Sequence, residues 1–228
     1  MNSAIIVAAG SSRRMGLDKL TSLLRGKPVV AHSLDRFEKC DLIDEVMLVI
    51  RPDRRLEFEQ IVQTFGFKKI NKIVDGGEER HLSVWNGITH LSESSEIVAV
   101  HDAARPLVSP ALIRRAVVLA REVGAISLAA PIVETLKRAD ATGNVTDNVD
   151  RAGLWGMQTP QVFRTQWLAH AYRRIIDSGR SVTDEVSALQ EAGYPVQLLQ
   201  NPDWNIKITF PRDLDFAEKL IKLGEFSF

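Results

Sequence analysis

Small and basic residues follow the first apolar run of the sequence. Residues 8–10 are Ala-Ala-Gly, and Arg13, Arg14 and Lys19 come soon after. Small side chains let the backbone approach a ligand closely, and its N–H groups then act with the cations to bind phosphate oxygens. Neither GxGxxG nor GxxxxGK(S/T) fits the spacing, which disfavours a dinucleotide-binding turn and a Walker ATPase. The segment therefore predicts another kind of polyphosphate site, with a solvated basic loop as the alternative.

An acid and two more cations accompany later apolar runs. Asp102 and Arg105 follow the run 97–101, and Lys207 lies inside the run 206–209. A carboxylate at the tip of a central strand can hold Mg²⁺ or a ribose hydroxyl, and an arginine beside it binds phosphate. The alternative for Asp102 and Arg105 is a salt-bridged turn. Lys207 points either to a bound phosphate or to an edge where its ammonium reaches water.

Three further clusters combine hydroxyls, acids and cations. They are residues 75–80 with Ser83, residues 150–161, and residues 183–185. Taken singly, they fit ordinary structure better: a glycine turn before a helix, a loop, and a helix N-terminus with acids in its first turn. Their combination with the two segments above favours a site for phosphorylated ligands.

Composition and missing motifs narrow the remaining classes. The five histidines form no HExxH or His-x-His pair, no GxSxG occurs, and the single Cys40 excludes disulfide, Cys-zinc and CxxC chemistry. A lone cysteine also indicates a reducing, cytoplasmic compartment. With 29 Lys+Arg against 29 Asp+Glu the net charge is 0, so we expect small anionic ligands and no nucleic acid. The apolar run 4–9 is far shorter than the roughly 20 residues of a membrane helix, so we expect no membrane span, signal peptide or membrane partner.

These candidate residues must be positioned by alternating strands and helices. The predicted strands are 4–9, 46–50, 70–74, 97–101, 125–130, 196–199 and 206–209. The predicted helices are 28–39, 56–65, 81–91, 110–123, 165–178, 183–192 and 211–223. This alternation indicates an α/β fold with a mostly parallel sheet and helices on both faces. Ligands of such sheets bind at the carboxyl ends of the strands, where the candidate residues lie.

One polar, turn-rich segment interrupts the alternation. A hairpin turn at 140–144 joins the short runs 134–138 and 145–149, so we predict a projecting β-arm over about residues 132–150. A two-stranded arm is marginal alone, and a second subunit is a reasonable packing partner. No linker or repeat divides the chain, so we expect one domain over residues 1–228.

The motifs occur in one order along nearly the whole chain, from 8–16 through 76–80, 101–106, 149–151, Trp155, 159–161 and 183–185 to 205–209. This order resembles the 2-C-methyl-D-erythritol 4-phosphate cytidylyltransferases. The resemblance implies a single Rossmann-like nucleotidyltransferase domain with a mixed, mostly parallel sheet, and a homodimer that exchanges contacts through the arm. It also implies that CTP and methylerythritol phosphate react to 4-diphosphocytidyl-2-C-methylerythritol and pyrophosphate, in the non-mevalonate isoprenoid pathway, with a divalent ion, usually Mg²⁺.

The resemblance also implies a role for each site residue. The positions that would bind CTP are Ala8, Ala9, Gly10, Gly77, Glu78, Ser83, Asp102 and Ala103. The catalytic cations would be Arg14, Lys19, Lys207 and Arg151. The acceptor phosphate would be bound with the help of Arg105, Thr159, Thr183 and Thr135, the last from the arm of a partner subunit. Asp102 would touch a Mg²⁺ held mainly by the CTP phosphates.

The implied reaction joins two anionic reactants, so neutralising their charge is its main requirement. A phosphate monoester attacks the α-phosphate of a polyanion, so cations that neutralise and align the reactants account for most of the barrier reduction. The attacking oxygen is ionised near neutrality, since its second pKa is about 6, and no general base is required. Two alternatives stay open: a ribitol-5-phosphate cytidylyltransferase, and a nucleotide-sensing subunit that binds CTP without transferring it.

Overall fold

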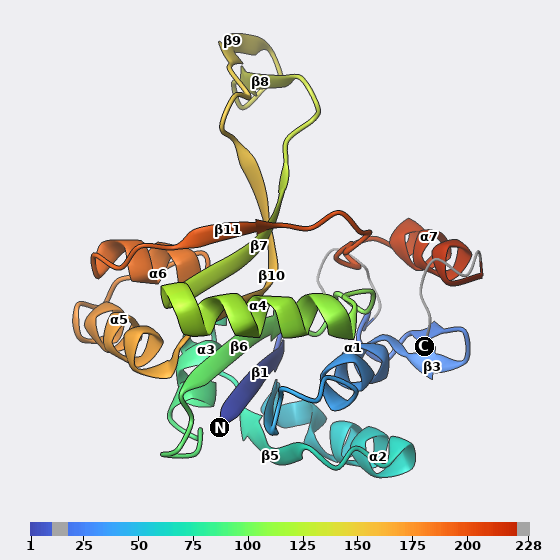
Figure 1. Ribbon diagram of the computed structural model, residues 1–228. Coiled ribbons are helices and arrows are strands. Elements are labelled where there is room, and N and C mark those ends of the chain that lie inside the picture. Colours follow the sequence, from blue (N-terminus) through green and yellow to red (C-terminus); the bar gives the residue numbers. More distant parts are fainter. Residues whose placement is uncertain (11–17, 223–228) are drawn as a thin grey trace.

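A central mixed sheet organises the fold (Figure 1). The computed structural model describes residues 1–10 and 18–222, and its main sheet has seven strands in the order β11-β7-β10-β6-β1-β4-β5. In chain order these are β1 (Asn2–Ala8), β4 (Glu45–Ile50), β5 (Ile70–Asp75), β6 (Ile97–Asp102), β7 (Ala125–Pro131), β10 (Trp155–Arg164) and β11 (Gln197–Gln200). Every neighbouring pair is parallel except those of β10, which runs antiparallel to both β6 and β7. The expected mixed, mostly parallel α/β sheet is confirmed.

Both faces of the sheet are covered by helices because its central strands are apolar on both sides. In β1, Ala4 and Ile6 belong to one core cluster while Ile5 belongs to the other. The first cluster holds side chains of α1 (Val29–Glu38), α2 (Arg55–Phe65) and α4 (Pro110–Val123). The second holds side chains of α3 (Arg80–Ile88), α5 (Thr165–Asp177) and α6 (Glu185–Glu191).

The ends of α4 show how local sequence sets an element. Ser109 Oγ accepts a hydrogen bond from the Leu112 N–H at 3.2 Å, and Pro110 takes the first helical position. Gly124, with φ of 93°, follows the last turn. Because these capping signals lie next to the helix in the sequence, the bounds predicted for α4, 110–123, agree with those of the structure.

Two predictions about the sheet are corrected. Residues 206–209 were expected to form a strand, but they run outside any strand, and the Ile208 N–H donates to the Ala104 carbonyl at 2.8 Å. Their apolar alternation reflects packing against α7 (Pro211–Lys222), in a third cluster that buries Ile208 completely. Conversely, β10 was not predicted, because its sequence lacks apolar alternation and contains a proline.

Smaller elements complete the described chain. A two-stranded ribbon, β2 (Leu23–Leu24) with β3 (Lys27–Pro28), and a 3₁₀ turn, Pro52–Arg54, precede α1 and α2 respectively. No helix among the described residues has the length and apolar character needed to cross a bilayer.

The arm continues β7 and β10 away from the body of the protein (Figure 1). Its strands are β8 (Leu136–Ala139) and β9 (Val145–Val149), which pair antiparallel. Asp140 Oδ1 holds the turn by accepting from the N–H groups of Thr142 and Asn144, both at 2.9 Å. Val133 and Val145 on the arm are 70% and 65% exposed, so apolar surface lies uncovered there.

Candidate active site at the carboxyl edge of the sheet

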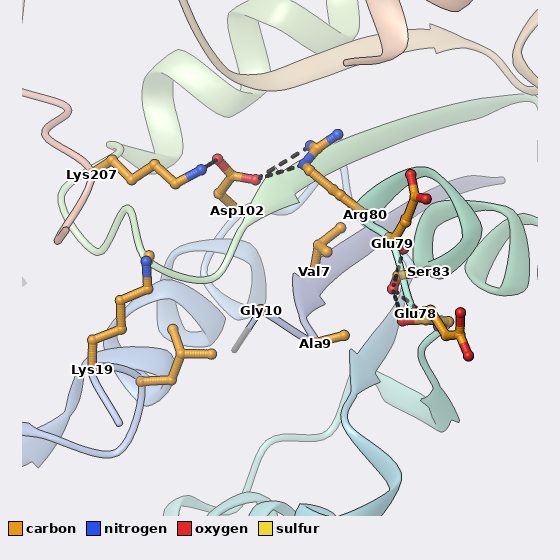
Figure 2. A pocket seen from close by; sticks show the side chains of 13 residues that line it. Val7, Ala9, Gly10, Lys19, Glu78, Glu79, Arg80, Ser83, Asp102 and Lys207 are labelled. Atoms are coloured by element: carbon orange, nitrogen blue, oxygen red, sulfur yellow. Dashed lines mark hydrogen bonds and ion pairs between the residues drawn. The ribbon is translucent and has the colours of Figure 1, made fainter. Parts of the chain in front are cut away.

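A cavity of about 320 Å³ lies where β1, β5 and β6 end (Figure 2). Its wall comes from the loops that follow these strands, from the start of α3, and from Lys207 of the segment before α7. Residues from distant parts of the chain meet here because the carboxyl ends of parallel strands share one edge of the sheet. This is the edge at which ligands of α/β proteins bind.

Asp102, at the end of β6, is surrounded by cations. Its Oδ2 accepts from Lys207 Nζ at 2.7 Å and lies 3.8 Å from Arg105 Nε. Its Oδ1 accepts from Arg80 Nε and Nη2, both at 3.3 Å. Burial alone would raise the pKa of Asp102, but the charges of Arg80, Lys207 and Arg105 outweigh it and hold that pKa well below its ordinary value. Asp102 is therefore an anion throughout the neutral pH range.

The main chain of Asp102 is fixed by a second chain of hydrogen bonds. Its N–H donates to Thr159 Oγ1 at 3.0 Å, Thr159 Oγ1 lies 3.1 Å from His101 Nδ1, and His101 Nε2 lies 3.1 Å from the Arg105 carbonyl. Burial lowers the pKa of His101 to about 4, so its ring is neutral. Because a carbonyl only accepts, Nε2 carries the proton and Nδ1 accepts from the Thr159 hydroxyl. The Thr159 hydroxyl thus donates its proton to His101 while its oxygen accepts from the Asp102 N–H.

The turn after β5 forms another part of the wall. The Gly76 N–H donates to the Ile50 carbonyl at 2.6 Å, and the Gly77 N–H donates to Ser83 Oγ at 3.1 Å. A Cβ on Gly76 would come within 2.4 Å of the Ala9 Cβ, a distance that side chains do not tolerate. Glycine at this position therefore lets the loops after β1 and β5 touch, which closes this side of the cavity.

The structure places the predicted site residues in three groups. The first group lines the cavity: Ala9, Gly10, Lys19, Gly77, Glu78, Ser83, Asp102 and Lys207. The second group does not line the cavity but adjoins residues that do. Ala8 is buried, and the Ala103 N–H donates to the Val7 carbonyl at 3.1 Å. Arg105 and Thr159 contact Asp102. Arg14, together with the rest of residues 11–17, falls outside the described residues.

The third group is separated from the cavity within one chain. Arg151 and Thr135 are exposed at the base of the arm, where Arg151 donates to the Val133 carbonyl. Thr183 is exposed just before α6, and its Oγ1 lies 3.3 Å from Ser187 Oγ. None of these three lines the cavity formed by the described residues.

Arg80 and Glu185 belong to the site, although their residue types and spacing did not predict a role for either. Arg80 lines the cavity and bridges Asp102 to Glu185, whose side chain has 0% exposure. A signal for Glu185 was present in the sequence: it shares the buried stripe of α6 with Ala188 and Leu189, a position where a carboxylate needs a partner.

An α/β sheet whose carboxyl edge holds a cavity lined by charged side chains of both signs fits a nucleotide-binding enzyme of the nucleotidyltransferase class. Comparison with known families agrees, since the family model described as 2-C-methyl-D-erythritol 4-phosphate cytidylyltransferase (IspD) matches residues 2–223. The chain belongs to this family.

Individual relatives resemble the chain over nearly its whole length. The 2-C-methyl-D-erythritol 4-phosphate cytidylyltransferase of Alkaliphilus metalliredigens is 38% identical over 222 residues, which is 96% of this chain and 92% of that protein. The bifunctional enzyme IspD/IspF of Desulfotalea psychrophila is 41% identical over 97% of this chain and 57% of its own length. The crystal structure of 4-diphosphocytidyl-2C-methyl-D-erythritol synthase from Anaerococcus prevotii superposes with a TM-score of 0.84 at 28% identity, covering 97% of this chain and 96% of that one.

Proposed function

We propose that this protein transfers the cytidylyl group of CTP to 2-C-methyl-D-erythritol 4-phosphate, releasing pyrophosphate, in the non-mevalonate isoprenoid pathway. Family membership supports the reaction. The structural observation that carries the proposal is the meeting of Lys19, Lys207 and ionised Asp102 in one cavity. Those charges suit a nucleoside triphosphate, whose phosphates need cations and whose ribose hydroxyls need an acceptor.

CTP is proposed to lie with its base toward the Gly77 turn and its triphosphate toward Lys19. Ala9, Glu78 and Ser83 stand beside that turn. Glycine is needed there because a Cβ on Gly77 would come within 2.5 Å of Leu82 Cβ. The ribose would meet Asp102 and Ala103. The Gly10 N–H would donate to the triphosphate, and Lys19 and Arg14 would neutralise its charge.

In the proposed reaction, a phosphate oxygen of the acceptor forms a bond to the α-phosphorus of CTP. The bond from that phosphorus to the bridging oxygen breaks, and pyrophosphate leaves with the electron pair. Lys207 would move its ammonium from Asp102 to the α-phosphate, where negative charge gathers as the attacking anion approaches. The side chain of Lys207 is 37% exposed, so it has room to move.

Mg²⁺ is proposed to enter with CTP. The described residues contain no group of three His, Cys, Asp or Glu side chains able to hold a metal ion, and the phosphates together with water would supply most of its ligands. Asp102 fits as a protein ligand because it is ionised and its Oδ2 faces the cavity rim at Lys207. The ion would neutralise triphosphate charge.

The acceptor site is proposed to form at the contact of two subunits in a homodimer. Arg151 would bind the methylerythritol phosphate, with Arg105 and Thr183 assisting and Thr135 coming from the arm of the partner. Thr159 would assist indirectly, through its hydrogen bond with the Asp102 N–H. Exposed Val133 and Val145 support this arrangement, because a second chain would cover them. A cytoplasmic location is likewise part of the proposal.

The experiment is a substrate panel with purified protein. CTP and Mg²⁺ are mixed with methylerythritol 4-phosphate, with ribitol 5-phosphate, or with no acceptor, and pyrophosphate release is followed. We expect release with methylerythritol phosphate and at least about tenfold less with the other mixtures, since leaving even one buried polar group unpaired costs about 1–3 kcal/mol. A preference for ribitol 5-phosphate would indicate the alternative transferase, and CTP binding without release would indicate a nucleotide sensor.

A further inference from the structure

We propose that Arg80 is a positioning residue, which holds Asp102 in its CTP-binding orientation and is itself locked in place by buried Glu185 and Tyr172. The inference rests on the function proposed above, because it assigns Asp102 to CTP. We refer to Arg80, Glu185 and Tyr172 as the Arg80 network.

The guanidinium of Arg80 is engaged on two sides. Nη1 and Nη2 donate to Oε1 and Oε2 of Glu185 at 2.6 and 3.1 Å, which is a bidentate pair. Nε and Nη2 donate to Asp102 Oδ1, both at 3.3 Å. These contacts use most of the N–H donors that an arginine has. Arg80 therefore has little capacity left to bind a phosphate directly, although it lines the cavity.

The far side of the network is buried. The Glu185 side chain has 0% exposure, and the Tyr172 hydroxyl donates to its Oε1 at 2.9 Å. Burial would lower the pKa of Arg80, but the charges of Glu185 and Asp102 raise it well above its ordinary value. Moving Arg80 toward a ligand would leave Glu185 as a buried, unpaired anion, which is strongly unfavourable. Arg80 is for this reason a fixed cation.

The network ties three helices to the tip of β6. Arg80 begins α3, Tyr172 belongs to α5 and Glu185 begins α6, and all three helices cover the same face of the sheet. Asp102 stands between Arg80 and Lys207 (Figure 2). Fixed Arg80 thus restrains Oδ1, while Oδ2 faces the more exposed Lys207. When Lys207 moves to the α-phosphate, Oδ2 becomes available to CTP and the carboxylate keeps its direction.

A double-mutant cycle tests the inference. The dissociation constant for CTP with Mg²⁺ is measured by titration calorimetry for the whole protein and for Arg80→Lys, Asp102→Asn and the double variant. Lysine keeps the positive charge but cannot make the bidentate hydrogen bonds of a guanidinium. We expect Arg80→Lys to weaken CTP binding about tenfold in the native background and less than about twofold beside Asp102→Asn, since residues that act through one another are not additive. Arg55→Lys is the matched control: Arg55 pairs with Asp75 at 2.6 Å, neither residue lines the cavity, and CTP binding should not change.

Equal weakening in both backgrounds would overturn the inference, as would an Arg80→Lys effect no larger than that of Arg55→Lys. If Arg80→Lys does not fold, Tyr172→Phe replaces it, because it removes one hydrogen bond and leaves every charge. We then expect about threefold weaker binding that disappears beside Asp102→Asn, and a background-independent effect overturns the inference. Pyrophosphate release by the unaltered protein is measured separately, so failure of the proposed reaction is distinguished from failure of this inference.

Discussion

Replacing Lys207 by methionine tests the cation proposed to act on the α-phosphate. Methionine keeps much of the apolar stem and removes the ammonium. In the structure that ammonium reaches 2.7 Å from Asp102 Oδ2, so it can approach a phosphate oxygen at the cavity rim as closely. Asp102 stays ionised in the variant because Arg80 and Arg105 remain beside it. The substitution thus removes one charge without neutralising its partner.

The size of the effect follows from the charge and its exposure. Two unit charges about 4 Å apart interact by about 4 kcal/mol at an effective dielectric constant of about 20. Lys207 is 37% exposed, and solvent screening reduces this figure to about 3 kcal/mol. Since about 1.4 kcal/mol corresponds to a factor of ten in rate, kcat should fall about 10²-fold. Loss of one preorganised donor in other active sites has a similar effect.

The assay is single-turnover formation of pyrophosphate at saturating CTP, which reports the chemical step. Lys72→Met is the control, because Lys72 is an exposed lysine of β5 that donates to the His90 carbonyl and lies outside the cavity. A Lys207→Met variant that keeps kcat within about threefold of the unaltered protein, with the control unchanged, would refute the role assigned to this ammonium.

Three further predictions concern packing, pH and the acceptor. Gly87→Ala should lower the free energy of unfolding by about 1–3 kcal/mol, because the new Cβ meets Ile5 Cγ2 at 2.7 Å; urea denaturation that matches the unaltered protein would contradict this close packing. The pKa of His101 is about 4 in the folded protein and 6.5 in the unfolded chain. Between these pH values only the unfolded state gains the proton, so the free energy of unfolding should fall by about 3 kcal/mol as the pH is lowered. In urea titrations at pH 7 and pH 4.5, His101→Gln should show a correspondingly smaller drop, and an identical drop would be inconsistent with a neutral buried ring. Arg151→Ala should raise KM for methylerythritol phosphate at least about tenfold with less change in KM for CTP; unchanged acceptor kinetics would remove Arg151 from the site.

The parts of the fold that local sequence determines were predictable. The β-arm was predicted because a turn-forming Asp140 lies between two short runs, and α4 because its cap and its final glycine are adjacent to it in sequence. Strand β10 was not predictable in this way, since its sequence lacks apolar alternation and contains a proline. The strand predicted over residues 206–209 was wrong because burial of Ile208 against a helix gives the same apolar alternation as burial in a sheet.

The residues of the candidate site likewise fall into those that local sequence predicts and those that it does not. Asp102 and the glycine turn were predictable, because residues that end strands of a parallel sheet meet at one edge. The roles of Arg80 and Glu185 were not, since their pairing joins positions 105 residues apart and shows only as a charge on an apolar helix stripe. The acceptor residues proposed on the arm would depend on a second chain in the proposed homodimer, and no pattern within one sequence positions such a chain.

The most direct test of the central claim is a crystal structure of the protein with CTP and Mg²⁺. We expect the triphosphate in the cavity between Lys19 and Lys207, with Lys207 Nζ on an α-phosphate oxygen and the ribose beside Asp102. Nucleotide bound at another surface, or in this cavity with its α-phosphate out of reach of Lys207, would contradict that claim.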